Sequence, residues 1–222
     1  MRREVRLELV IVALAASVTL ASRAPLAYAD AKAADAAFLK GKELQQKKQY
    51  QEACAAFEDS FREDPKIGAQ LNVARCYQEW GKTATAHRAY EEALRLAREA
   101  KDKRASQIQD LIDELLPAVP VVMISLPPGR LAPEGLTVTV DGQELAHELL
   151  GKPRRLDPGP HAVEMRLTGA EPRTLSVTAT AKQRSELVLP IDAALAEAAS
   201  DEPAPPAATG PAAPARGAVK YR

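Results

Sequence analysis

The sequence predicts an α+β fold, in which an array of helical hairpins with a capping helix precedes a small antiparallel β-sandwich. Between residues 34 and 93 one helical pattern occurs twice with a period of 33 residues, which indicates a repeat architecture. After the helical region the apolar positions begin to alternate, which indicates strands. Near the end the composition shifts to alanine, proline and glycine, which favours a disordered tail. The predicted parts are a signal peptide, the helical array, the β-sandwich and the tail, at residues 1–29, 30–117, 118–191 and 192–222.

The first 29 residues have the three parts of a secretory signal peptide. Three arginines precede the apolar run Leu7–Ala21, and small residues at Ala27 and Ala29 suit signal peptidase. We therefore expect cleavage between Ala29 and Asp30. The run is short for a membrane span, which needs roughly 20 residues. We therefore predict a periplasmic or secreted protein. The alternative is a protein anchored in the inner membrane, in which the first segment is not cleaved.

The two copies of the helical pattern place small residues on small residues and bulky apolar residues on bulky apolar ones. The pairs that the period relates are Gly41 with Ala74, Leu44 with Tyr77, Ala53 with Ala86, and Phe57 with Tyr90. Together with Pro65, this series resembles the tetratricopeptide repeat. The resemblance implies stacked helical hairpins with a concave groove that binds a protein or peptide. Because such arrays ordinarily need at least three repeats, we expect either support from the next domain or self-association.

Helical spacing of apolar residues predicts five helices before Pro117. They are expected at about 30–46, 50–64, 67–80, 83–99 and 103–115. Gly81 breaks the chain between the third and fourth helices, and the hydroxyl of Thr83 is expected to cap the fourth. The last helix has apolar residues on one face only, as a helix that closes the end of a repeat stack requires.

The two cysteines of the chain, Cys54 and Cys76, fall on the second helix of the first repeat and the first helix of the second. These helices pack against each other in a stacked array, so an exported protein could join them by a disulfide. Two buried free thiols are the alternative. A bridge would stabilise a short array by about 3 kcal/mol in the chain-entropy model.

Short alternating segments predict five or six strands that tight turns separate. The expected strands cover about 121–125, 136–140, 161–167, 175–179 and 187–189. The dipeptide Asp141-Gly142 is a strong signal for a two-residue hairpin turn. The segments Val138–Gly142 and Asp157–Val163 resemble the small PEGA-like β-domains. Such domains follow tetratricopeptide hairpins in envelope proteins of Gram-negative bacteria, notably myxobacteria.

The sequence has no recognisable catalytic or metal site. Lys and Arg total 30 and Asp and Glu total 30, so no basic field favours nucleic acid. The histidines His87, His147 and His161 have no cluster of cysteines or carboxylates at ligand spacing. We expect His87 to be exposed and His161 to pack or cap. The segment Gly81–Thr83 lacks the upstream glycine of a phosphate-binding loop, because Cys76 occupies that position. We expect no cofactor, no metal and no enzymatic activity; a hydrolase in the β-domain is the minor alternative.

The first helix of each repeat is expected to line the concave groove. The groove candidates are Phe38, Lys42 and Gln45 from the first repeat and Leu71, Asn72 and Arg75 from the second. Lys42, Asn72 and Arg75 together suit a carboxylate or an extended peptide backbone. The plain alternative is that these are ordinary solvated helix residues. The predicted function is a non-enzymatic, exported adaptor of the bacterial cell envelope that binds a protein or peptide; the alternative is a membrane-anchored structural spacer.

Overall fold

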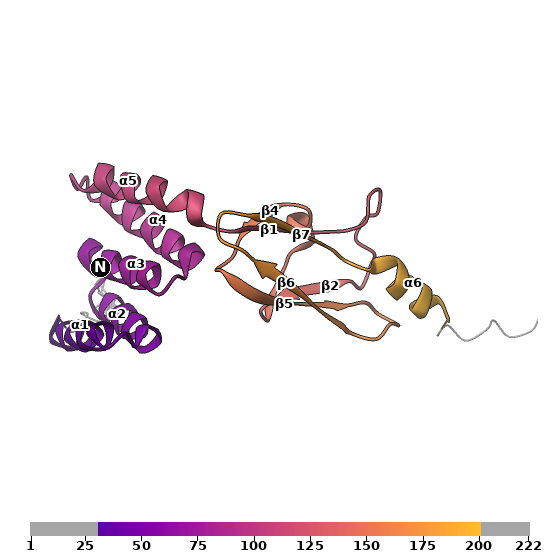
Figure 1. Ribbon diagram of the computed structural model, residues 1–222, viewed down its shortest axis with the longest axis horizontal. Helices are drawn as coiled ribbons and strands as arrows, with labels where there is room; N and C mark the ends of the chain where they lie inside the picture. Colours follow the sequence, from indigo (N-terminus) through magenta and orange to yellow (C-terminus); the bar gives the residue numbers. More distant parts are fainter. Residues whose placement is uncertain (1–30, 201–222) are drawn as a thin grey trace, which may run out of the picture.

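The computed structural model describes residues 31–200, in which a helical array at one end leads into a β-domain (Figure 1). The predicted signal peptide and the residues beyond Ser200 lie outside the described residues. The array consists of α1 (Ala31–Gln46), α2 (Tyr50–Glu63), α3 (Ile67–Glu79), α4 (Thr83–Glu99) and α5 (Ala105–Leu115). These helices follow the predicted positions. The short 3-10 helix η1 (Leu116–Ala118) connects α5 to the first strand.

Close packing of helix backbones explains the small residues of the repeat. Gly41 of α1 faces the ring of Phe57 of α2, and a Cβ atom at Gly41 would lie only 2.9 Å from that ring. The equivalent position in the second hairpin, Ala74 of α3, is fully buried. The second hairpin turns at Gly81, whose φ of 80° is in the left-handed region that favours glycine.

A disulfide joins the two hairpins inside the array. Cys54 of α2 and Cys76 of α3 are fully buried, and their Cα atoms lie 5.5 Å apart. Of the two alternatives for these cysteines, the structure has the bridge. It fixes the second helix of one hairpin against the first helix of the next.

The β-domain is a sandwich of two small sheets (Figure 1). Its strands are β1 (Val121–Ser125), β2 (Thr137–Val140), β3 (Gln143–Glu144), β4 (Pro153–Arg155), β5 (Gly159–Arg166), β6 (Arg173–Ala179) and β7 (Arg184–Val188), with the 3-10 helix η2 (His147–Leu149) between β3 and β4. The sheet β3-β2-β5-β6 is antiparallel throughout, as predicted. In the sheet β4-β1-β7, however, β1 and β7 run parallel. Alternation could not predict this, because it specifies the faces of a strand and not its direction.

Asp141 and Gly142 form the predicted hairpin turn between β2 and β3. Their φ angles are 51° and 77°, and a type I′ turn requires left-handed values at both central positions. Val140 pairs with Gln143 across the turn. The carboxylate of Asp141 also accepts a hydrogen bond from the backbone N–H of Ala162 at 3.1 Å, which ties the turn to β5.

Helix α6 (Ile191–Ser200) occupies the first part of the segment predicted as a disordered tail, so that prediction is wrong for residues 192–200. Ile191 is fully buried and Ala194 is 1% exposed, both in the core of the β-domain. Arg130 pairs with Asp192 at 2.7 Å and holds the first turn of α6. The prediction of a tail took alanine, proline and glycine together as a sign of disorder. Alanine alone favours helices, and a few buried side chains are enough to dock this helix on the β-domain.

The helical array and the β-domain meet where α4 begins. The hydroxyl of Thr83 is buried without a hydrogen-bond partner, so the prediction that it caps α4 is wrong. The carboxylate of Asp157, in the loop before β5, takes this role. It accepts hydrogen bonds from the backbone N–H of Thr85 at 2.9 Å and from the hydroxyl of Thr85 at 2.7 Å. A residue of the β-domain therefore caps a helix of the array.

Candidate functional site

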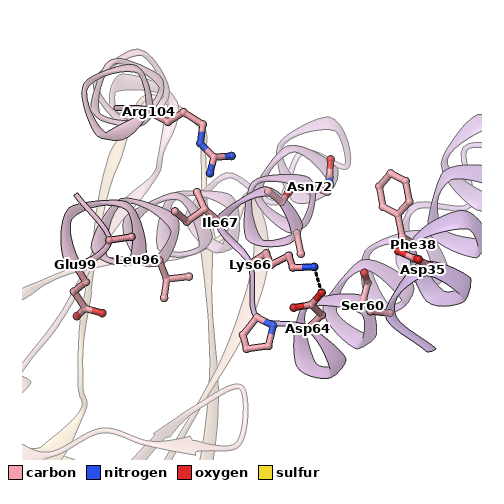
Figure 2. A pocket seen from close by; sticks show the side chains of 15 residues that line it. Asp35, Phe38, Ser60, Asp64, Lys66, Ile67, Asn72, Leu96, Glu99 and Arg104 are labelled. Carbon is pink, nitrogen blue, oxygen red and sulfur yellow. Dashed lines mark hydrogen bonds and ion pairs between the residues drawn. The ribbon is translucent and has the colours of Figure 1, made fainter. Parts of the chain in front are cut away.

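A hollow of about 700 Å³, the array hollow, opens on the helical array. It is lined by α1, α2, the α2–α3 turn, α3, the end of α4 and the residue before α5, through Ala34, Asp35, Phe38, Ser60, Asp64–Ala69, Asn72, Leu96, Glu99, Ala100 and Arg104. Figure 2 shows Phe38 on one side of the hollow and Arg104 on the other, with Asn72 between them. Segments from both hairpins and the residue that precedes the capping helix thus converge on one concave site.

The basic side chains around the array hollow are held by neighbouring carboxylates. Lys66 pairs with Asp64 (Figure 2). Arg104 donates hydrogen bonds to the carboxylate of Asp102 at 2.8 and 2.9 Å, and these lower the pKa of the Asp102 carboxyl to about 2. Asp35 of α1 is exposed, and its negative charge acts with that of Asp64 to raise the pKa of Lys66. Of the charged side chains around the hollow, Lys66 and Arg104 are ion-paired with Asp64 and Asp102, whereas Asp35 is exposed at the rim.

An aromatic ring and an amide are the other groups that a ligand would meet. The ring of Phe38 is half-buried and packs against the ring of Phe57, with 5.8 Å between the centroids. The amide nitrogen of Asn72 donates to the carbonyl of Gly68 at 2.9 Å. Within the described part of the chain, the oxygen of the same side-chain amide of Asn72 accepts no hydrogen bond. It can therefore accept one from a peptide N–H.

Two of the predicted groove residues, Phe38 and Asn72, line the array hollow. Lys42 and Arg75 are exposed on α1 and α3 but do not line it. The structure therefore brings Asn72 together with Phe38, and it does not place the predicted basic pair at the hollow.

The two remaining predicted groove residues, Leu71 and Gln45, make contacts within the array and do not line the hollow. Leu71 is 9% exposed and belongs to the core of the array. Gln45 donates a hydrogen bond to the carboxylate of Glu79 at 2.7 Å and so links α1 to α3. Sequence reasoning missed the contributions of the α2–α3 turn and of Arg104, because it assigned the groove only to the first helices of the repeats. The period itself was a usable signal, since it makes the turn after α2 equivalent to the turn after α4, and residues of both turns line the hollow.

His87 differs from its expectation. It was expected to be exposed, but it is 3% exposed, because α4 packs against both α3 and α5 and little of its circumference is left to solvent. Burial lowers the pKa of His87, although its Nδ1 atom lies 3.3 Å from the carboxylate of Glu91, which acts in the opposite direction.

The described residues contain neither a grouped metal-ligand set nor a membrane-spanning helix. Between residues 31 and 200, no three His, Cys, Asp or Glu side chains lie together as a metal ion would need. In the same range, no helix is both long enough and apolar enough to cross a bilayer.

Stacked hairpins, small residues at helix crossings and a hollow on one face are the geometry of a helical repeat. A family model described as tetratricopeptide repeat matches residues 34–67 and again residues 67–99. This region is a pair of tetratricopeptide repeats. The two matches cover α1 to α4, so the predicted resemblance is confirmed for the tetratricopeptide pair. In a comparison with curated proteins, nothing matches the chain. The tetratricopeptide pair indicates a role in binding another protein.

Proposed function

We propose that this protein is a non-enzymatic adaptor that binds a protein or peptide in the array hollow of its tetratricopeptide pair. The observation that carries the proposal is a concave site of about 700 Å³ to which both repeats and Arg104, the residue before α5, contribute. Its walls combine apolar surface with a few polar groups, as peptide-binding sites do. The resident charges are largely paired with each other, so the hollow suits a ligand that is mainly apolar and main-chain in character.

An extended peptide segment fits these groups. An apolar side chain of the peptide would pack on the ring of Phe38. A peptide N–H would donate to the side-chain amide oxygen of Asn72, and a basic side chain of the peptide would pair with Asp35.

The proposal places the protein outside the cytoplasm, in the cell envelope. The signal-peptide pattern of the first 29 residues supports export. The disulfide between Cys54 and Cys76 suits an oxidising compartment, and the resemblance of the β-domain to PEGA-like domains favours an envelope protein. Amino-terminal sequencing of the protein from cells tests this location. A first residue at Asp30 supports export with cleavage, whereas an intact first segment would favour the membrane-anchored spacer.

Blocking the array hollow tests the binding role. Ala69 lines the hollow, so Ala69→Met fills it without adding charge. Ala55 is exposed on α2 away from the hollow, so Ala55→Met is the matched control. After chemical crosslinking in an envelope extract, we expect the unchanged chain and Ala55→Met to retain the same partner and Ala69→Met to lose it, at equal melting temperatures. Recovery of the same partner from all three proteins would contradict binding in the hollow.

A further inference from the structure

A second cavity, the junction cavity, lies where the β-domain meets α4. It has a volume of about 390 Å³. Its polar lining comes from both domains and includes Arg88 of α4, Arg154 and Arg155 of β4, and Asp141, Asp157 and His161. It shares no lining residue with the array hollow.

The three arginines of the junction cavity have no carboxylate partner. Many arginines of the described chain do have one at ion-pair distance, namely Arg62, Arg95, Arg104, Arg130, Arg166 and Arg173. Arg88 donates a hydrogen bond to the hydroxyl of Thr85 at 2.8 Å, and no ion pair joins Arg88, Arg154 or Arg155 to an acidic side chain of residues 31–200. Three guanidinium groups therefore line one cavity without an ion pair to an acidic side chain of residues 31–200, although the carboxylates of Asp141 and Asp157 also line it.

Arg154 is held at the cavity by the sheet. It pairs with Val122 of β1, which is fully buried, so Arg154 lies on the core side of the edge strand β4. The Nε atom of Arg154 is buried and has no hydrogen-bond partner in the described chain. Burying part of a guanidinium without an acceptor is unfavourable, and an anion bound at its outer nitrogens would stabilise the positive charge of the same group.

The acidic residues of the cavity, Asp141 and Asp157, form no ion pair with these three arginines, and each of their oxygens accepts a hydrogen bond from another group. The carboxylate of Asp157 accepts both hydrogen bonds from Thr85. The carboxylate of Asp141 accepts hydrogen bonds from the ring of His161 at 2.6 Å and from the backbone N–H of Ala162 at 3.1 Å. The opposite nitrogen of His161 donates to the carbonyl of Asp157 at 2.7 Å, so the histidine also presents a positively charged ring to this region.

We propose that the junction cavity binds an oxyanion group, a phosphate or a carboxylate, through Arg88, Arg154 and Arg155. Planar guanidinium groups match the paired oxygens of both anions, and this match is closer than a lysine could give. Because the arginines belong to α4 and to β4, a bound anion joins the helical array to the β-domain. This site is separate from the proposed peptide site and does not depend on it.

Titration of the purified full chain with anions tests the site. Sodium phosphate and sodium acetate are added in separate series, with sodium chloride at matched ionic strength as the reference, and the melting temperature is recorded. We expect a saturable rise in melting temperature with phosphate or with acetate, and none with chloride. The anion that saturates identifies the chemical source, and either one supports the site.

Variants locate the binding. Arg154→Gln and Arg155→Gln each remove one guanidinium, and we expect the dissociation constant of the saturating anion to rise about tenfold in each. Arg184→Gln is the matched control, because Arg184 of β7 is exposed, has no carboxylate partner in the described range and lies outside the cavity. The proposal is overturned if neither anion gives a saturable rise, or if Arg184→Gln weakens binding as much as the two cavity variants.

Discussion

The carboxylate of Asp157 caps the first turn of α4 through Thr85, although 72 residues separate the two in the sequence. The N-cap residue of α4, Lys82, makes no capping hydrogen bond with its side chain. The free backbone N–H groups at a helix start need acceptors, and here the β-domain supplies one. Folding of the β-domain and completion of α4 are therefore coupled.

Replacing the interdomain cap should destabilise the protein. We expect Asp157→Ala to lower the free energy of unfolding by about 1 kcal/mol, the usual effect of losing a helix cap, as measured by urea denaturation. Asp59→Ala is the control, because Asp59 pairs with Arg62 on the exposed surface of α2 and such pairs contribute roughly 0 to 1 kcal/mol. Hydrogen exchange of the Thr85 amide should become faster in Asp157→Ala; an unchanged rate would show that the cap is not formed in solution.

The hydrogen bonds of His161 predict a pH dependence. Burial by itself would lower the pKa of His161, but its hydrogen bonds to Asp141 and to the carbonyl of Asp157 outweigh this and raise the pKa. The folded chain then binds a proton more tightly than the unfolded chain. Stability should therefore fall as the pH rises from about 6.5, the ordinary histidine value, through the folded pKa. We expect His161→Gln to reduce this dependence of stability on pH, measured as melting temperature at a series of pH values above about 6.5.

A second histidine acts in the opposite direction and in another pH range. Because burial lowers the pKa of His87 in the folded chain, the unfolded chain binds a proton at this histidine more readily than the folded chain does when the pH is below about 6.5. Stability should fall there as the pH is lowered, and His87→Gln should remove that loss. The slope above 6.5 should survive in His87→Gln; its disappearance there would mean that the assignment of the two ranges is wrong.

Opening the disulfide should weaken the array. Cys54 and Cys76 close a loop with a sequence separation of 22 residues, and the chain-entropy model gives about 3 kcal/mol for a loop of this size. We expect the double variant Cys54→Ala/Cys76→Ala to lose that much, measured by denaturant unfolding. Reductant should bring the unchanged chain to about the stability of the double variant and leave the double variant itself unaffected. A chain that resists reductant with no change in stability would contradict the expectation.

Two glycines of the array should respond differently to alanine. At Gly41 an added Cβ would meet the Phe57 ring at 2.9 Å, so Gly41→Ala should cost about 2 kcal/mol, as overpacking of a core does. At Gly68 the nearest atom to an added Cβ is a nitrogen of Arg104 at 4.0 Å. Gly68→Ala should therefore leave stability unchanged or raise it by up to about 1 kcal/mol, through helix propensity. Equal losses from both substitutions would contradict the packing argument.

The helical array could be predicted from the sequence because its signals are local. The spacing of Gly41 and Phe57, repeated one period later, records which side chains meet between neighbouring helices. The turn at Asp141-Gly142 is equally local, since two adjacent residues must both adopt left-handed conformations.

The parts that could not be predicted depend on contacts between distant segments. No spacing rule relates Asp157 to Thr85, and the cap that the sequence suggested, Thr83, is buried without a partner. The array hollow was found in part, through Phe38 and Asn72. Its remaining walls come from α2, the α2–α3 turn, the end of α4 and the residue before α5, whose positions depend on how the hairpins stack.

The parallel pairing of β1 with β7 has a mechanical consequence. The chain enters the β-domain at Val121, next to the array, and leaves β7 at Val188 toward α6 at the opposite end of the molecule (Figure 1). A force that pulls the array away from α6 would draw these two strands past each other along their length. Their hydrogen bonds, from the pair Val121–Arg184 to the pair Ser125–Val188, would then have to break together and not one after another. The smaller sheet therefore resists tension along the long axis of the protein.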